Sequence, residues 1–175
     1  MGIQIRTAAP EDASAACAVL RRSIQECCVE DHKNDSALLE SWLGNKTPEQ
    51  VAAWIATPAN HTLVAERDGE VVGVALVTQA GKLSLCYALP EVHHSGVGKA
   101  LLAGAEAKAR EWGISVMRLH STLAAREFYA RNGYTNAGKD KTCYGMECDL
   151  FWKNLDAEPG ACAATGKRFC NCNAS

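Results

Sequence analysis

The chain has 175 residues, of which 47% are hydrophobic and 22% are charged, and its formal net charge is −2. This length fits one domain, and the composition is that of a globular protein with enough apolar residues for a core. Because basic residues are not in excess, the charge does not indicate binding to nucleic acid or to an anionic membrane. The first six residues lack the apolar core of a signal peptide, and no apolar run is long enough to cross a bilayer.

Nine cysteines are many for this length, and their number is odd. In a chain without a secretion signal they predict reduced thiols and a cytoplasmic protein, not a disulfide framework. Cys17 and Cys86 lie in apolar patterns, so we expect them to pack as small buried hydrophobic residues.

The first half of the chain has a strand pattern followed by several helix signals. Pro10 and two acidic residues suit the first turn of a helix, and Thr47 followed by Pro48 suits an N-cap and a first helical position. The expected elements are a strand near residues 3–5, a helix over 10–24, a polar loop over 26–34, a short helix over 38–43 and a helix from 48.

The second half alternates strands with helices. Asp68 and Gly69 between two apolar runs are a strong hairpin signal, and Glu106 with Arg110 predicts a surface ion pair on a helix that Gly113 ends. The expected elements are strands over 63–67, 71–78 and 83–89, a helix over 97–112, a strand over 116–120, a helix over 124–132, a strand from 134 and a last strand over 142–150.

The segment that joins the 83–89 strand to the next helix is the most informative part of the chain. Pro90 ends the strand, and Gly96 and Gly98 stand two residues apart where the helix begins. Glycines let the backbone turn and approach a ligand closely, and the first turn of a helix offers unpaired N–H groups and a positive dipole. The pattern indicates a phosphate or pyrophosphate site, and on spacing alone an ordinary loop with glycines that ease packing is equally compatible.

Two segments resemble motifs of the GNAT acyltransferases, which transfer an acetyl group from acetyl-CoA to an amine. The turn His93-His94-Ser95-Gly96-Val97-Gly98 follows Ala88-Leu89-Pro90, and residues 122–134 contain Phe128-Tyr129 and Gly133-Tyr134 in the order of the second motif. The chain departs from the family at His93, usually Arg or Gln, at Thr122, often Asn, and mildly at Ala88.

The resemblance extends from about Ile3 to about Leu150 and implies a GNAT domain over residues 1–155. The implied fold is α/β (α+β), with a mixed, mostly antiparallel central sheet flanked by helices on both faces. Residues 156–175 then form a separate tail. Metal binding by this tail is not expected, because its cysteines and two preceding ones lack the paired C-x-x-C spacing of a zinc knuckle. These five residues are Cys143, Cys148, Cys162, Cys170 and Cys172.

The resemblance also implies acetyl-CoA as cosubstrate and places it along the chain. The pantetheine arm would pair with the strand at Tyr87 and Ala88, and backbone N–H groups near Ala88 and Leu89 would hold the acyl oxygen. His93 has two open interpretations, a solvated loop imidazole or a direct phosphate contact. The pyrophosphate would lie on the N–H groups of His94, Ser95, Gly96, Val97, Gly98 and Lys99.

Tyr129 is the candidate catalytic residue, because it matches the family tyrosine whose hydroxyl protonates the departing thiolate. A phenol has an ordinary pKa of about 10, so it stays protonated and able to donate. The alternative role is that of a core aromatic residue. The general base is not evident, because His120 suits this role chemically but is also compatible with a structural histidine at a strand end.

The segment that covers the acceptor in the family contains Glu26, Asp31 and His32. These residues would either attract a cationic amine or belong to a solvated loop.

The predicted function is acyl-CoA-dependent N-acyl transfer, with acetyl passing to a primary amine by direct attack in a ternary complex. The acceptor would be a small-molecule or peptide amine, and no nucleic-acid or membrane partner is expected. Whether the protein forms a homodimer is left open by the sequence. The alternative is an acyl-CoA-binding sensor or regulatory module without transfer activity. This alternative stays open because no general base is identified and because the chain departs from the family at His93 and Thr122. A thiol- or zinc-dependent interaction protein built on the tail is a weaker third interpretation.

Overall fold

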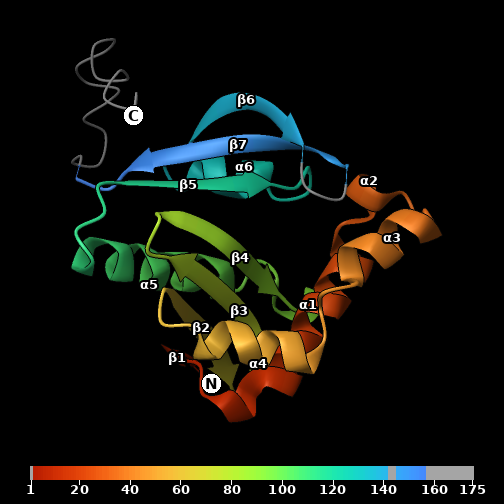
Figure 1. The fold of residues 1–175 in the computed structure, drawn as a ribbon, viewed down its shortest axis with the longest axis horizontal. Coiled ribbons are helices and arrows are strands. Elements are labelled where there is room, and N and C mark those ends of the chain that lie inside the picture. The colour runs from red at the N-terminus through yellow and green to blue at the C-terminus, as the bar shows by residue number, and fades with distance from the viewer. Residues whose placement is uncertain (1, 142–144, 157–175) are drawn as a thin grey trace.

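One seven-stranded sheet forms the centre of the protein. The computed structural model describes residues 2–141 and 145–156. The strands lie in the order β1-β2-β3-β4-β5-β7-β6, and β4 and β5 are the parallel pair while the other neighbours are antiparallel (Figure 1). The strands are β1 (Ile3–Thr7), β2 (Asn60–Arg67), β3 (Glu70–Thr78), β4 (Lys82–Ala88), β5 (Val116–Ser121), β6 (Thr135–Lys141) and β7 (Glu147–Asn154). The predicted mixed, mostly antiparallel sheet is confirmed.

Helices cover both faces of this sheet. Leu63 and Val77 pack against α5 on one face, whereas Val64 and Val74, one position out of phase, pack against α1 and α4 on the other. Because both faces of β2 and β3 are covered, these strands are apolar on both sides. The α-helices are α1 (Ala13–Cys27), α2 (Val29–His32), α3 (Ser36–Leu43), α4 (Pro48–Ala56), α5 (Val97–Glu111) and α6 (Arg126–Arg131), and the 3₁₀-helices are η1 (Pro10–Asp12) and η2 (Pro90–Val92).

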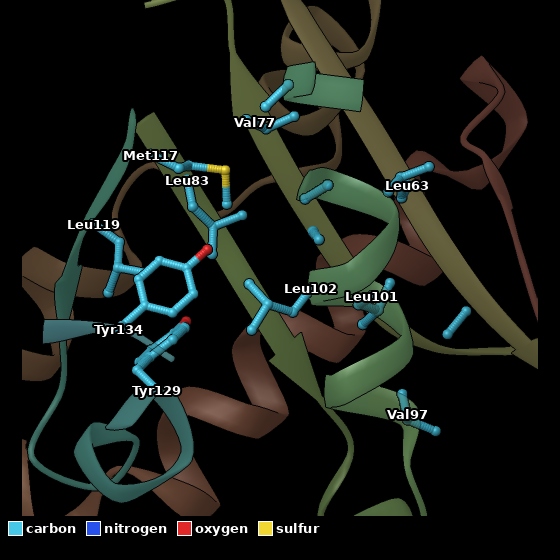
Figure 2. Packing of buried hydrophobic residues seen from close by; sticks show 14 of the residues in the cluster. Leu63, Val77, Leu83, Val97, Leu101, Leu102, Met117, Leu119, Tyr129 and Tyr134 are labelled. Carbon is cyan, nitrogen blue, oxygen red and sulfur yellow. The ribbon is translucent and has the colours of Figure 1, made fainter. Parts of the chain in front are cut away.

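The larger core cluster lies between the sheet and α5. Figure 2 shows Val97, Leu101 and Leu102 of α5 on one side and Tyr129 and Tyr134 at its opposite edge. No helix in the described ranges is long and apolar enough to cross a membrane.

The sheet opens between its two central strands. Two residue pairs join β4 to β5, Lys82 with Arg118 and Leu83 with Leu119, and beyond them the strands diverge (Figure 1). The pairing of β3 with β4 also shifts register around Ser84, and such a bulge bends a strand. The second half of β4 therefore presents an edge toward the opening.

The polar segment 26–34, predicted as a loop, is mostly helical. Helix α1 continues to Cys27 and α2 follows it. His32 is fully buried, its Nε2 lies 3.0 Å from the carbonyl oxygen of Ile24, and its Nδ1 accepts a 3.0 Å hydrogen bond from the Asn34 N–H. These hydrogen bonds satisfy the polar side chain inside the fold, so polarity was a poor guide to exposure here.

Two further details differ from the sequence-based expectations. Glu106 is buried rather than at the surface: it accepts hydrogen bonds from the Tyr134 hydroxyl at 2.9 Å and from Lys153 Nζ at 3.1 Å, with Arg110 further away at 3.8 Å. The last strand is Glu147–Asn154, and residues 142–144 lie outside the described residues.

The hairpin signal was correct. Asp68 (φ 53°) and Gly69 (φ 82°) form the two-residue connection between β2 and β3, and positive φ at both positions is typical of a type I′ turn.

Candidate active site

The glycine turn lies between η2 and α5 and has an unusual backbone conformation. His94 (φ 63°) and Gly96 (φ 93°) both adopt left-handed conformations, and α5 begins at Val97. A Cβ built on Gly96 would meet nothing within 4 Å, so the backbone angle and not crowding is what favours glycine there. The turn therefore directs the chain into the helix and leaves space above the first N–H groups of α5.

Gly98 has a different role. A Cβ at this position would lie 3.3 Å from two carbon atoms of the Phe128 ring, which comes from α6. The glycine thus permits close packing of α5 on α6. Gly98 therefore eases packing, as the ordinary-loop interpretation expects, whereas the phosphate site stays a prediction.

A cavity of about 740 Å³ lies beside this turn, and we call it the first cavity. Seven of the ten predicted site residues line it, whereas Leu89, Ser95 and Val97 do not. The Leu89 N–H donates to the Val72 carbonyl at 2.9 Å, and the Ser95 N–H donates to the Val92 carbonyl at 3.3 Å. Val97 is fully buried. The predicted acyl-oxygen contact from the Leu89 N–H is therefore unsupported. The seven are Tyr87, Ala88, His94, Gly96, Gly98, Lys99 and Tyr129.

Tyr129 belongs both to the core and to the wall of the first cavity. Its ring packs with Phe128 at 5.1 Å and with Tyr134 at 5.7 Å between centroids. Its hydroxyl donates a hydrogen bond to the thiol of Cys86 on β4. Burial, with the neighbouring Cys86, raises the pKa of Tyr129 well above its ordinary value, so the phenol stays protonated.

Cys86 packs against the core but is half-buried rather than fully buried, because it also lines the first cavity. Burial raises the pKa of its thiol to about 12, partly opposed by the hydrogen bond from Tyr129. A thiol with so high a pKa is a poor nucleophile at neutral pH, which argues against covalent catalysis by this residue.

His93 is exposed, as a solvated loop imidazole would be, and a direct phosphate contact stays a prediction. Its Nε2 lies 3.3 Å from the Ala88 carbonyl oxygen and 3.6 Å from the Cys27 sulfur. The side chain therefore points back toward α1 and the end of β4.

The segment predicted to cover an acceptor supplies a structural contact instead. Asp31 is buried, and its carboxylate accepts hydrogen bonds from the N–H groups of Leu123 at 2.7 Å and Ala124 at 3.4 Å. Burial raises the pKa of Asp31, and these two N–H groups oppose the rise. Asp31 thus holds the loop between β5 and α6 in place, whereas the hydrogen bonds of His32 stay within its own segment. Glu26 pairs with Arg22 and lines the first cavity.

A second cavity of about 430 Å³ lies on the other side of the opening in the sheet, between β4, β5 and the α3–α4 region. It adjoins the first cavity, and six residues line both of them. The shared residues are Leu83, Ser84, Leu85, Tyr87, His120 and Thr122.

His120 stands at the junction of the two cavities and is paired with a carboxylate. Its Nε2 lies 2.8 Å from Oδ2 of Asp140 on β6. The hydrogen bond from His120 is the main cause that lowers the pKa of Asp140, so this carboxylate is ionised and accepts. A neutral His120 then carries its proton on Nε2 and keeps a lone pair on Nδ1. The sequence had no signal for this pair, because the two residues are 20 positions apart on strands that are not neighbours.

Most of the cysteines considered as zinc ligands lie outside the residues that the structure describes. Cys143 and the three tail cysteines lie outside the described residues, and the described member of the set, Cys148, is buried on β7. The expectation that the tail binds no metal stays a prediction.

Comparisons with known proteins identify the family. Residues 28–148 match the model described as the acetyltransferase (GNAT) domain. The aminoalkylphosphonate N-acetyltransferase of Salmonella typhimurium is 30% identical over an alignment of 141 residues, which covers 71% of this chain and 88% of that protein. The chain therefore belongs to the GNAT acetyltransferase family.

Solved structures agree with this assignment. The PaiA N-acetyltransferase of Thermoplasma acidophilum in complex with coenzyme A superposes with a TM-score of 0.75 at 25% identity, over 88% of this chain and 99% of that one. A GCN5-related N-acetyltransferase from Rhodopseudomonas palustris has the same fold, with a TM-score of 0.79 at 22% identity over 88% of this chain and 96% of that one.

Proposed function

We propose that this protein transfers an acetyl group from acetyl-CoA to a primary amine by direct attack within a ternary complex. The observation that carries the proposal is that the two cavities adjoin at the opening between β4 and β5 and share six lining residues. With the cosubstrate in the first cavity and the amine in the second, the reacting groups would meet beside the residues that line both.

The backbone supports this arrangement. Beyond Leu83 the edge of β4 is not paired with β5, so an extended pantetheine arm could add to it as a peptide strand adds to a sheet edge. The N–H groups of the first turn of α5, together with the helix dipole, suit the pyrophosphate. Lys99 in this turn adds a positive charge beside the first cavity.

The side chains supply the two proton transfers that the reaction needs. His120, polarised by Asp140, would accept the proton that the attacking amine loses. Tyr129, kept protonated by burial, would hydrogen-bond to the departing sulfur and pass it the proton, and would be reprotonated before the next turnover. Direct transfer requires no covalent intermediate on the protein, in agreement with the protonated state of Cys86.

Turnover of acetyl-CoA with a panel of primary amines tests the proposal. The Salmonella relative is named for aminoalkylphosphonates, so such amines belong in the panel. An acyl-CoA sensor would bind the cosubstrate and form no acetylated product with any amine. Product formation therefore distinguishes the enzyme from the sensor.

Gly96→Ala is expected to weaken acetyl-CoA binding by about tenfold or more. A side chain at φ 93° costs about 1–2 kcal/mol of backbone strain, so the turn must either leave this conformation or carry that strain. Gly113→Ala is the matched control, since Gly113 has φ 79° and open space but ends α5 away from both cavities. Calorimetric titration with acetyl-CoA and a thermal melt measure the two effects. Equal affinities in the two variants would contradict this placement of the pyrophosphate.

A further inference from the structure

The wall of the second cavity carries an excess of positive charge. Lys46, Lys82 and Lys141 line it together with His120, and none of its described lining residues is Asp or Glu. Within the described parts of the chain, Lys82 and Lys141 form no ion pair, whereas other lysines such as Lys139 do.

The carboxylates nearest to this wall are already engaged. Asp140 accepts the 2.8 Å hydrogen bond from His120, and its charge is further compensated by Lys82. Asp149 is buried and pairs with Arg126 at 2.9 Å and with Lys139 at 3.2 Å. Asp140 therefore offsets part of the charge of Lys82, whereas Asp149 is engaged by Arg126 and Lys139. The residues that line the cavity still include more basic than acidic side chains.

Lys46 is held in a fixed position in this wall. Its side chain is almost fully buried, and Nζ donates to the Trp42 carbonyl at 3.2 Å and to Asn45 Oδ1 at 2.7 Å. Nζ also lies 6.0 Å from the centre of the Trp54 ring. Lys82 and Lys141 are therefore the lysines of the wall that are available to an anionic group.

The rest of the wall limits the size and polarity of an occupant. Trp42, Trp54 and Tyr87 supply aromatic surface, and a volume of about 430 Å³ is at the small end for a small-molecule site. This space suits a short molecule with an apolar body, not a folded protein surface.

We infer that the acceptor is a small primary amine that also carries an anionic group, a carboxylate or a phosphonate. The inference rests on the proposed function and names the substrate class of that site. The anionic group would lie toward Lys82 and Lys141, and the amine would point toward His120 at the junction with the first cavity.

The charge of the wall also favours the chemistry. Nearby positive charges destabilise an ammonium relative to the neutral amine, and the neutral amine is the form that attacks. A diamine or polyamine would bring further positive charge into the same wall and is disfavoured. An acceptor with an anionic group would instead pair that group with the lysines.

A panel of matched amines tests this inference. The anionic members are 2-aminoethylphosphonate and β-alanine, the neutral members are propylamine and ethanolamine, and the cationic member is 1,3-diaminopropane. We expect kcat/KM to be at least about tenfold higher for one of the anionic amines than for the neutral ones, and lowest for the diamine. The two anionic amines distinguish phosphonate from carboxylate.

Charge-removing variants connect any preference to the cavity. Lys82→Gln and Lys141→Gln are expected to raise KM for the preferred anionic amine several-fold and to leave KM for propylamine nearly unchanged. Lys108→Gln is the control, because this lysine pairs with Glu111 on α5 outside both cavities.

The outcomes separate the inference from the proposed function. Preference for the diamine or for neutral amines would overturn the inference and leave the N-acetyltransferase proposal intact. An anionic preference that survives in both lysine variants would also overturn it. Binding of acetyl-CoA without acetylation of any amine would contradict the proposed function itself, and the inference with it.

Discussion

Tyr129→Phe is expected to lower turnover about 100-fold, near the low end of the range for acid catalysis, while the affinity for acetyl-CoA changes little. The hydroxyl matters mainly as negative charge develops on the departing sulfur, so its loss affects the transition state more than binding. The effect should be at the low end because a thiolate, with an ordinary thiol pKa of about 8.5, is already a tolerable leaving group.

In the structure, Tyr129→Phe removes the hydroxyl and keeps the packing of the ring. Phenylalanine keeps the ring contacts of Tyr129 with Phe128, Tyr134 and Phe151, and the lost hydrogen bond is the one to the thiol of Cys86. Steady-state kinetics and a thermal melt on the purified variant measure the result.

Tyr134→Phe is the matched control for Tyr129→Phe. Its hydroxyl, in the same aromatic cluster, donates to buried Glu106 at 2.9 Å, and Tyr134 lines neither cavity. The control should lose about 1 kcal/mol or more of stability and keep its turnover. Full turnover in Tyr129→Phe, or equal losses in both variants, would leave Tyr129 as a core aromatic residue only.

His120→Gln is expected to lower kcat about 100- to 10,000-fold, because it removes the proposed proton acceptor at the junction of the cavities. Asp140→Asn should cost less, since Asp140 acts through His120 by orienting the imidazole. The readout specific to a base is the pH profile of turnover: any loss of turnover toward acid pH in the wild type should be absent in His120→Gln.

His61→Gln controls for the loss of an imidazole as such. His61 lies on β2, packs edge-on against Trp112 with 6.3 Å between ring centres, and lines neither cavity. It should retain full turnover and the wild-type pH profile. If His120→Gln also retains them, the proton must leave through another group or through water.

The parts of the fold that local chemistry determines were predictable from sequence. The hairpin at Asp68 and Gly69 requires positive φ at both residues, and the turn at Gly96 requires it again, so residue type alone indicates these turns. The pairing of Tyr129 with Phe128 was likewise evident from the sequence motif, whereas its hydrogen bond to Cys86 was not.

The parts that depend on distant partners were not predictable. Asp31 looked like a residue of a solvated loop because its two N–H partners lie more than 90 positions further along the chain. His120 lacked a visible partner because Asp140 approaches it from β6. The cationic wall combines lysines from separate elements, and sequence spacing carries no information on such a cluster.

Initial velocities measured while acetyl-CoA and an accepted amine are both varied test the central claim most directly, with the acetylated product identified by mass spectrometry. Direct transfer in a ternary complex predicts one acetylated amine per CoA released and double-reciprocal lines that intersect. Parallel lines would indicate a covalent acyl-protein instead. Saturable binding of acetyl-CoA with no acetylated amine would contradict the account and identify the protein as a sensor.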